Sequence, residues 1–575
     1  MKPAAVITTS IEQSLKELDL PQVSVELEHP ANRDFGDYST NAALTIFGQL
    51  DQDQQQRLAV SNPRQLAEKI AGQIDILLQR SHSDLAAEIS VAGPGFINFT
   101  LSEKFLLQEL KQLAAGTISL PQTGSGQTVV IDYSAPNIAK RFSIGHLRST
   151  IIGQAIYNLY QALDWEAIGD NHLGDWGTQF GKMIVAIRSW ADKDVDQLTI
   201  PEMEQLYVRF HQEAEQNPTL NDQARQAFKD LEQGKAEETK LWQQLVEQSM
   251  QEFDQIYQLL DVEIDYAYGE SFYQDIMPDV IALAKEKGLA EESEGALIFP
   301  YSEEDLPPAM LQKKDGATTY FTRDLATIKF RKDQWHPELV VYEVGAEQKL
   351  HFRQVFLAAE MLGLIAKEKL VHIPHGLISL KQGKMSTRQG NVVKLEQVLS
   401  QAIKKAKKFN PDPDLAKIVG IGAVKYNDLK RAPERSYTFD WEEMLSLEGN
   451  SGPYLQYTHA RCQSLLEKSP VSYEKFGVEQ QLSADYQLNQ EELNILRNLY
   501  QAPEIIEKAA EEFAPHHLCT YLHQLAQTYN SFYNKHPILD SPEDRQLLRL
   551  ALTKAVAVTL DYYLGLLGIT APDQM

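Results

Sequence analysis

The chain has 575 residues, of which 43% are hydrophobic and 23% charged, values typical of globular proteins with sizeable cores. This length predicts three or four domains. The formal net charge of −26 argues, taken alone, against a nucleic-acid partner, because phosphate contacts need Lys and Arg, although a local basic strip can lie on an acidic protein.

Two further features exclude whole classes of protein. Cys462 and Cys519 are the only cysteines and form no CxxC pair, which argues against a disulfide framework and a cysteine-based zinc site. The N-terminus reaches polar residues at once, and no run approaches 18 uncharged apolar residues. We therefore expect neither a signal peptide nor a membrane span, and a cytoplasmic location.

The first 120 residues look like a small α/β domain. Residues 92–102, AGPGFINFTLS, predict a turn into a strand with Phe96 and Asn98 on one face and Ile97 and Phe99 on the other. If the face of Ile97 is the core, Phe96 and Asn98 are exposed. An exposed aromatic ring beside an amide could stack on and bond an unpaired base, and a small core aromatic is the alternative.

A Gly-, Ser- and Pro-rich linker at 116–127 precedes the most informative stretch of the chain. An apolar strand at 128–131 leads into a turn, and apolar residues then recur every four positions from Leu147 to Leu163, which predicts a helix. Strand, Gly-containing turn and helix begin nucleotide sites in parallel α/β sheets. An ordinary βα unit with a histidine at its turn is the alternative.

The remaining pattern predicts a doubly wound sheet followed by a helical bundle. Residues 191–265 are charged and helical, and strands are expected at 165–170, 318–321, 339–344 and 372–379. The fold class is therefore α/β, with a doubly wound parallel (Rossmann-type) domain, a helical insertion, a small α/β N-terminal domain and an all-α C-terminal bundle. The predicted boundaries are 1–120, 121–400 with its insertion at about 191–265, a connecting helical segment at 401–450, and 451–575.

Two motifs carry the functional inference together. Ser143-Ile144-Gly145-His146 opens the helix after the first strand, and Lys384-Met385-Ser386-Thr387-Arg388 lies between two glycines some 240 residues later. This ordered pair resembles the HIGH and KMSKS signatures of class I aminoacyl-tRNA synthetases. The blocks SAPNIAK, GHLRSTIIG, LGDWGTQFG, GESFY, YFTRDLA, VGAEQKLHF, KMSTRQGN and GPYLQYTHAR narrow the resemblance to the arginyl-tRNA synthetase family, over essentially the whole chain.

The resemblance implies an enzyme that activates L-arginine with ATP to arginyl-adenylate and esterifies it to the 3′-terminal adenosine of tRNA(Arg), with activation dependent on bound tRNA. Donors and cations that stabilise charge on the phosphates lower the barrier of the first step. The implied catalytic residues are Lys140, Ser143, His146, Lys384, Ser386 and Arg388. The implied ATP-binding residues are Gly145, His146, Gly345, Lys384 and Met385.

The substrate gives the pocket residues a physical reason. A guanidinium requires a carboxylate, and we assign that role to Asp324, with Tyr320 four residues earlier lining the pocket. A surface acid or a helix N-cap is the alternative for Asp324. Gln348 completes the pocket, and the family places the α-ammonium and carboxylate of arginine against the positions of Asp132, Ser134 and Asn137.

The resemblance also implies tRNA contacts. Tyr454, Tyr457 and Arg461 lie on one helix face that suits unstacked anticodon bases, although a tyrosine stripe in a core is the alternative. Phe96 and Asn98 correspond to contacts with the D-loop of tRNA. No spacing indicates a protein-bound metal, so Mg²⁺ is expected to arrive with ATP, and we expect no membrane contact and a monomer.

The sequence departs from the signatures at three positions. Ser143 replaces the first histidine of HIGH, Arg141 stands where proline is common, and Arg388 replaces the second lysine of KMSKS. The loss of that imidazole leaves a second hypothesis, a catalytically silent synthetase-like protein that binds tRNA or regulates. A small nucleotidyltransferase is a third, and the long helical C-terminal region argues against it.

Overall fold

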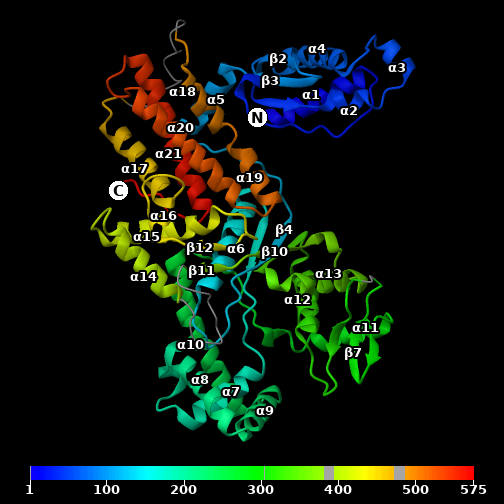
Figure 1. The fold of residues 1–575 in the computed structure, drawn as a ribbon, viewed down its shortest axis with the longest axis vertical. Coiled ribbons are helices and arrows are strands. Elements are labelled where there is room, and N and C mark those ends of the chain that lie inside the picture. The colour runs from blue at the N-terminus through cyan, green and yellow to red at the C-terminus, as the bar shows by residue number, and fades with distance from the viewer. Residues whose placement is uncertain (1, 303–304, 381–393, 472–485) are drawn as a thin grey trace. The chain divides into compact units, whose positions relative to one another are not determined.

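The computed structural model describes residues 2–302, 305–380, 394–471 and 486–575 (Figure 1). These residues form two compact units. Unit 1 contains Met1–Ile118, Leu465–Ala502 and Gln527–Thr559, and unit 2 contains Ser119–Ser464, Pro503–Ala526 and Leu560–Met575.

The N-terminal part of unit 1 is the small α/β domain expected from the sequence. Its antiparallel sheet has the order β1-β3-β2, with strands β1 (Tyr38–Thr40), β2 (Ala86–Ala92) and β3 (Phe96–Leu101). Its helices are α1 (Pro3–Glu17), α2 (Ala42–Phe47), α3 (Gln52–Arg57), α4 (Pro63–Ser81) and α5 (Glu103–Ala114), with the 3₁₀ turn η1 (Arg33–Phe35). Helix α4 shows why such an element forms: Asn62 caps it, Pro63 occupies its first turn, and one stripe of Leu and Ile is buried.

One expectation for this domain is wrong. Phe96 is 39% exposed, as predicted, but Asn98 is only 3% exposed, although Ile97 and Phe99 are fully buried on the other face. Strand β3 is the central strand of its sheet, and Asn98 lies between Ser39 of β1 and Ser90 of β2. Phe96 and Asn98 share a face of β3 yet differ in exposure, so alternation along the strand does not by itself predict exposure.

The second sheet is wholly parallel and positions the candidate site. Its order is β10-β9-β4-β5, with strands β4 (Thr128–Asp132), β5 (Glu166–Asp170), β9 (Leu339–Gly345) and β10 (Leu370–His375). Helix α6 (Ile144–Ala162) packs on one face, and helices α12 (Tyr320–Trp335) and α13 (Lys349–Met361) share a core with Val130, Val340 and Tyr342 on the other (Figure 1). The strand order changes direction between β4 and β9, which is the switch point where doubly wound folds bind ligands.

The helical insertion is present between α7 (Thr178–Trp190) and residue 265. It contains η2 (Val195–Gln197), α8 (Ile200–Gln216), α9 (Thr219–Glu232) and α10 (Ala236–Leu260). The 3₁₀ turn η3 (Glu270–Tyr273) and helix α11 (Met277–Glu286) come next. They are followed by a three-stranded antiparallel sheet of order β6-β7-β8, which the sequence pattern did not indicate. Its strands are β6 (Glu291–Ser293), β7 (Ala296–Phe299) and β8 (Ala309–Gln312).

The strand expected at 318–321 is wrong, because Tyr320 is the first residue of helix α12. The strand expected at 339–344 is confirmed as β9. The single strand expected at 372–379 is instead two strands: β10 in the parallel sheet, and β11 (Ile378–Leu380), which pairs with β12 (Tyr437–Phe439) in a separate sheet. The short 3₁₀ turns η4 (Ala346–Gln348) and η5 (Lys367–Lys369) flank α13.

The rest of the described chain is helical, as predicted. The helices are α14 (Leu395–Ala406), α15 (Pro413–Leu429), α16 (Trp441–Met444), α17 (Gly452–Lys468), α18 (Gln490–Leu499), α19 (Ala502–Glu511), α20 (His516–Lys535) and α21 (Glu543–Leu566). The backbone N–H of Tyr454 donates to Ser451 Oγ at 3.2 Å, so Ser451 caps α17. No helix in the part of the chain that the structure describes is long and apolar enough to cross a bilayer.

Candidate active site

Polar residues meet at the carboxyl ends of the four parallel strands. Asp132 of β4 is in register with Asp170 of β5, and His375 of β10 is in register with Gly345 of β9. The His375 imidazole contacts both carboxylate oxygens of buried Glu343 at 3.1 Å, and this contact outweighs burial and raises the pKa of His375. This edge is therefore charged and lies at the switch point of the sheet.

The turn from β4 to α6 is held in a demanding conformation. Ser134 has a φ of 75°, and its N–H donates to Ser149 Oγ at 3.0 Å while its hydroxyl contacts Tyr257 Oη at 2.8 Å. Asn137 lies against Gly174, where an added Cβ would come within 2.6 Å of Asn137 Oδ1. Ser134 and Asn137, two of the predicted arginine-binding residues, therefore lie in a turn whose conformation is fixed by contacts within the protein.

His146 lies in the first turn of α6 with a defined tautomer. The backbone N–H of Ser143 donates to His146 Nδ1 at 3.1 Å, so Nδ1 is an acceptor and carries no proton. Burial, and then the nearby cations Lys140 and His375, lower the pKa of His146 to about 4. The ring is therefore neutral at pH 7 and carries its proton on Nε2, where it is a hydrogen-bond donor.

Ser143 is the N-cap residue of α6, which gives the altered signature a structural role. The N–H of His146 donates to Ser143 O at 3.1 Å, and Ser143 Oγ contacts His146 Nδ1 at 3.3 Å. The imidazole reaches back to the N-cap backbone as Glu or Gln does in a capping box. A serine is a favourable N-cap, so this position keeps the helix start while losing one imidazole.

Two more predicted residues flank this turn. Burial lowers the pKa of Lys140, and the carboxylate of Glu204 opposes that shift. Gly145 is exposed in the first turn of α6, where the helix start carries partial positive charge. Lys384, Met385, Ser386 and Arg388 lie outside the described residues.

Helix α12 brings two of the predicted arginine-binding residues together. Tyr320, at its first position, is 63% exposed, and Asp324 follows one turn later. The Asp324 carboxylate bonds to His351 Nε2, and this partner outweighs burial and raises the pKa of His351. Because the helix begins four residues earlier, the alternative of Asp324 as an N-cap is wrong.

Glu270 and Arg323, for which no sequence pattern indicated a role, extend this face. Arg323 Nη1 donates to Glu270 Oε2 at 2.8 Å, and the Arg323 guanidinium lies over the Tyr320 ring, 5.1 Å from its centroid. Burial raises the pKa of Glu270 to about 7, Arg323 opposes the shift, and Asp324 and Asp175 add to it. Carboxylates that crowd in this way are stabilised by a cation, which an arginine side chain supplies.

The end of β9 contributes Gly345 and Gln348. Gly345 ends the strand, and an added Cβ there would come within 2.7 Å of Glu347 Oε2. Gln348 closes the short turn η4 and is exposed. Both residues therefore lie at the same sheet edge as Asp132, since β4 and β9 are adjacent parallel strands.

Arg331 is a site residue that no sequence motif indicated. It is fully buried, and its Nη2 lies 2.7 Å from Asp132 Oδ2 and 2.7 Å from Asp170 Oδ2. The two aspartates precede it by 199 and 161 residues, so no local pattern joins them. The sequence offered one indication of its place near the site: Arg331 follows Asp324 by seven residues, a spacing that puts both side chains on one face of a helix.

Tyr454, Tyr457 and Arg461, the tRNA-binding residues predicted on α17, place aromatic rings beside a cation. Tyr457 on α17 is 37% exposed, and the Arg461 guanidinium lies 4.9 Å from its ring centroid. Tyr454 packs edge-on against His523 at 5.6 Å. Tyr457 is therefore not a core residue, whereas Tyr454 is partly covered.

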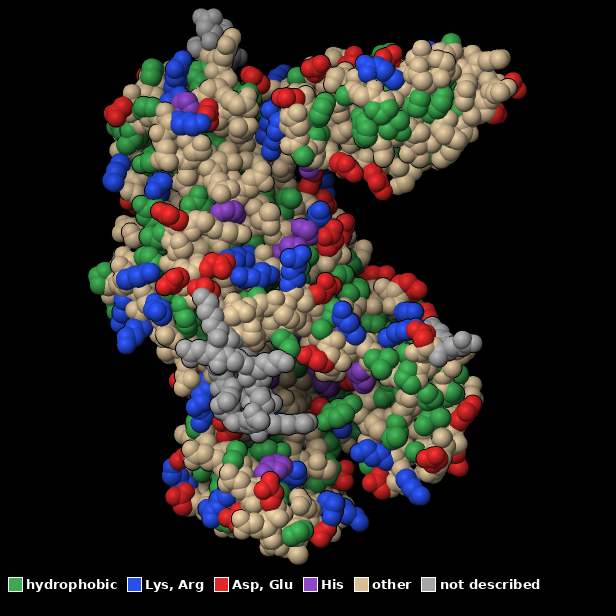
Figure 2. Space-filling model, viewed as in Figure 1, with side chains coloured by type: hydrophobic (Ala, Val, Ile, Leu, Met, Phe, Trp, Pro, Cys, Tyr) green, Lys and Arg blue, Asp and Glu red, His purple; other side chains and the backbone are tan. Residues whose placement is uncertain are grey.

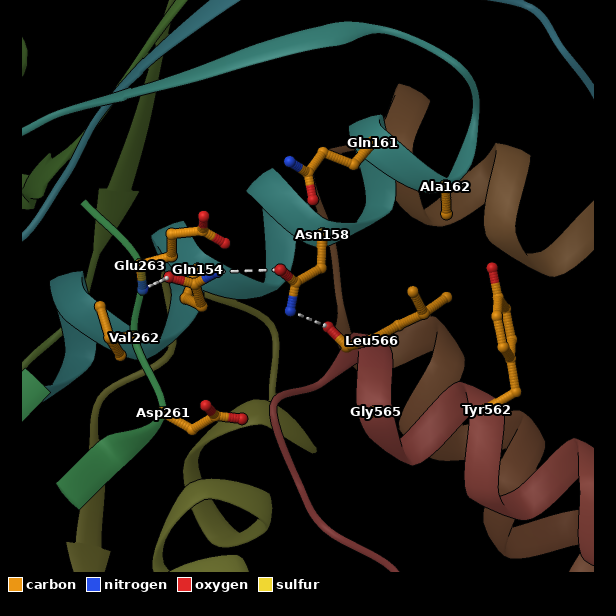
Figure 3. Close-up of a pocket in the computed structure, with 10 residues that line it drawn as sticks. All are labelled: Gln154, Asn158, Gln161, Ala162, Asp261, Val262, Glu263, Tyr562, Gly565 and Leu566. Carbon is orange, nitrogen blue, oxygen red and sulfur yellow. Dashed lines mark hydrogen bonds between the residues drawn. The ribbon is translucent and has the colours of Figure 1, made fainter. Parts of the chain in front are cut away.

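A cavity of about 660 Å³ lies along the other end of α6, away from His146 (Figure 3). Gln154 and Asn158 line it and bond to each other at 2.8 Å, and Asn158 Nδ2 donates to Leu566 O of α21 at 3.1 Å. None of the predicted site residues lines this cavity, and its amides are occupied by protein partners. Within the described ranges, no group of three His, Cys, Asp or Glu side chains is placed to hold a metal ion.

Family models match three consecutive parts of the chain. The model described as tRNA synthetases class I (R), catalytic domain, matches residues 109–441. The Arginyl tRNA synthetase N terminal domain matches residues 5–101, and the DALR anticodon binding domain matches residues 455–575.

Individual proteins match over nearly their whole length. Arginine–tRNA ligases from Halothermothrix orenii and Clostridioides difficile are each 38% identical to this chain, over 98% and 99% of both sequences respectively. The ligase of Streptococcus uberis is 39% identical over 100% of both. The crystal structure of arginyl-tRNA synthetase from Plasmodium falciparum superimposes with a TM-score of 0.84 at 26% identity, and that from Thermus thermophilus with 0.81 at 25%, each over 100% of both chains.

Proposed function

The chain belongs to the arginyl-tRNA synthetase family, and from that premise we propose that it is an active arginine–tRNA ligase. It activates L-arginine with ATP and transfers the arginyl group to the 3′-terminal adenosine of tRNA(Arg). The observation that carries catalysis, rather than a silent tRNA-binding role, is the geometry of His146. Its neutral ring, with Nε2–H as donor, remains at the helix start although Ser143 replaces the first signature histidine.

In the first step, a carboxylate oxygen of arginine attacks the α-phosphorus of ATP and pyrophosphate leaves. His146 Nε2–H donates to phosphate oxygens where negative charge develops, and the start of α6 adds its partial positive charge. In the second step, a ribose hydroxyl of the terminal adenosine attacks the carbonyl carbon of the adenylate, and AMP leaves. Lys140, Gly145 and Gly345 line the ATP side, and Ser143 positions His146 through its backbone N–H.

Arginine binds between the strand ends and α12 in this proposal. Asp324 receives the guanidinium in a bidentate contact, Tyr320 lies against the side chain, and Gln348 completes the pocket with its amide. Asp132, Ser134 and Asn137 hold the α-ammonium and carboxylate. The surplus of carboxylates around Glu270 and Asp324 supports this placement, because a bound cation relieves their repulsion.

The remaining assignments follow from the family. Residues 451–575 bind the anticodon region through Tyr454, Tyr457 and Arg461, and residues 1–120 contact the D-loop through the exposed Phe96. Residues 401–450 connect the bundle to the catalytic domain at 121–400. Lys384, Met385, Ser386 and Arg388 act on ATP and pyrophosphate. Mg²⁺ enters bound to ATP, and the protein works as a cytoplasmic monomer with tRNA-dependent activation.

ATP–pyrophosphate exchange tests this function directly. Exchange that requires arginine, and that appears or increases when tRNA(Arg) is added, is the expected result. Tight tRNA(Arg) binding without exchange would leave the silent tRNA-binding protein as the better description. Exchange without any amino acid would indicate a different nucleotidyltransferase.

Asp324→Asn tests the substrate assignment. Because the substitution keeps the shape but removes the charge that faces the guanidinium, the KM for arginine should rise roughly 10- to 100-fold and that for ATP should change little. Asp305→Asn is the matched control, since it removes an exposed carboxylate paired with Arg353. Equal increases in both KM values would refute the role of Asp324.

A further inference from the structure

Arg331 joins three elements beneath the proposed arginine pocket. It leaves α12, which also carries Tyr320 and Asp324, and crosses to the ends of two strands. Its Nε donates to Asp170 Oδ2 at 2.8 Å and its Nη2 to Asp132 Oδ2 at 2.7 Å. The guanidinium also lies over the Tyr342 ring of β9, 5.1 Å from its centroid.

These contacts connect the two halves of the pocket. Asp132 lies on β4 and faces the α-amino end of the substrate in the proposed function, whereas Asp324 lies on α12 and faces the guanidinium. Asp324 and Arg331 are seven residues apart on one helix face, so a fixed Arg331 also fixes the direction of Asp324. A planar guanidinium bonded to two carboxylates holds the distance between α12 and the ends of β4 and β5 more rigidly than apolar packing alone.

The charge of the buried cluster formed by Arg331, Asp132 and Asp170 supports a role beyond folding. One arginine faces two aspartates, which leaves a surplus negative charge in a buried place. Both aspartates are buried, Asp170 at 0% and Asp132 at 5% exposed. Arg331 Nη1, Asp170 Oδ1 and the hydroxyl of Tyr273 have no hydrogen-bond partner among the described residues, so the buried ion pair leaves polar atoms unsatisfied.

We propose that Arg331 is a positioning residue that sets the distance between the α-ammonium and guanidinium subsites, and so selects substrates by the length of their side chain. The inference rests on the proposed function. It makes Arg331 a residue of specificity that never touches the substrate. A purely structural role for Arg331, as a buried ion pair that stabilises the fold, is the alternative that an experiment must separate.

Arginine and homoarginine, which is longer by one methylene group, provide that experiment. Arg331→Lys keeps a positive charge but loses the planar fork and part of the reach. We expect the KM for arginine to rise roughly 10- to 100-fold, because small misplacements of binding groups have effects of that size. The preference for arginine over homoarginine in kcat/KM should fall about tenfold, within the range that one methylene controls.

Two variants and one control complete the design. Asp170→Asn removes one partner and the surplus charge without changing shape, so it serves if Arg331→Lys does not fold, and it should lower the preference in the same direction. Arg549→Lys is the matched control, because Arg549 is a buried arginine of unit 1 paired with Glu492 at 3.0 Å. It should reduce thermal stability without altering the preference.

The shift in melting temperature on adding arginine or homoarginine provides a readout independent of catalysis. If the wild-type chain is stabilised by arginine but shows no exchange, the proposed function fails and the melting shifts still test Arg331. An arginine-to-homoarginine preference that is unchanged in folded Arg331→Lys and Asp170→Asn would overturn the inference. A preference that falls only in these two variants and not in Arg549→Lys supports it.

Discussion

At the scale of the residue, His146 combines a protonation state and a tautomer that suit its role. Ser143 N–H occupies Nδ1, and burial near two cations keeps the ring neutral. A neutral imidazole that donates from Nε2 needs no titration during the reaction, unlike a general acid.

Replacing His146 should therefore affect the chemical step. His146→Ala removes one donor to the developing charge and should lower the exchange rate about 100- to 1000-fold, with little change in the KM for arginine. In the wild type, at saturating arginine and ATP, kcat should show no titration near pH 6.5, because the pKa of about 4 keeps His146 neutral down to low pH. An inflection near pH 6.5 that disappears in His146→Ala would contradict the assigned state.

Glu270 gives the pocket a pH dependence of its own. Its pKa of about 7 means that it is ionised above that pH in the free enzyme and gains a proton below it. Arginine keeps its charge throughout, so the KM for arginine should rise as the pH falls from 8 to 6. Glu270→Gln should raise that KM at pH 8 roughly 10-fold or more and flatten the profile.

The pH dependence of the KM must be separated from the titration of His351, whose pKa is raised by its contact with Asp324. The profile is measured again in His351→Asn, where the dependence on Glu270 should persist. A wild-type KM for arginine that is constant between pH 6 and 8 would show that Glu270 does not face the substrate.

At the scale of the element, the β4–α6 unit shows what local sequence determines. A buried strand, a turn and a four-residue apolar repeat lie within about 35 consecutive residues, and the structure has each of them in place. Ser143 is the informative exception, because its N-cap position is visible in the sequence but its bond to His146 Nδ1 depends on three-dimensional geometry.

Substitutions at Ser143 separate its backbone from its side chain. Ser143→Ala keeps the N–H that fixes His146 and loses only the hydroxyl contact, so exchange should fall by no more than about tenfold. Ser143→Pro removes that N–H and should cost far more, because Nδ1 loses its donor and the tautomer is no longer fixed. If alanine were as damaging as proline, the hydroxyl rather than the backbone would be the important group.

Elements whose form depends on distant partners were not predictable in the same way. Residues 318–321 are β-branched and aromatic, which favours a strand, yet they lead into α12 because its apolar face packs on the sheet. The sheet of β6, β7 and β8 has strands of three or four residues, too short for a clear period. Arg331 shows the same limit at a site, since its partners lie more than 160 residues away in sequence.

At the scale of the whole molecule, a net charge of −26 has to be reconciled with a tRNA substrate. Figure 2 shows acidic and basic side chains interspersed on the face drawn, with Lys and Arg gathered over α14. Four lysines cluster at the end of that helix: Lys404, Lys405, Lys407 and Lys408. All four lysines are exposed, and Lys405 also lies over Trp441 and Lys408 over Phe409.

This cluster should supply part of the salt-dependent affinity for tRNA. Lys404→Gln combined with Lys407→Gln removes two cations that can contact phosphates, so the slope of log KM for tRNA against log salt should fall by roughly 1 to 2. The KM for arginine should not change, because neither lysine belongs to the proposed arginine pocket. Lys229→Gln combined with Lys240→Gln, two exposed positions on the insertion helices, makes the same change in net charge. If both pairs altered the slope equally, the effect would come from net charge alone and the cluster on α14 would have no special part in binding tRNA.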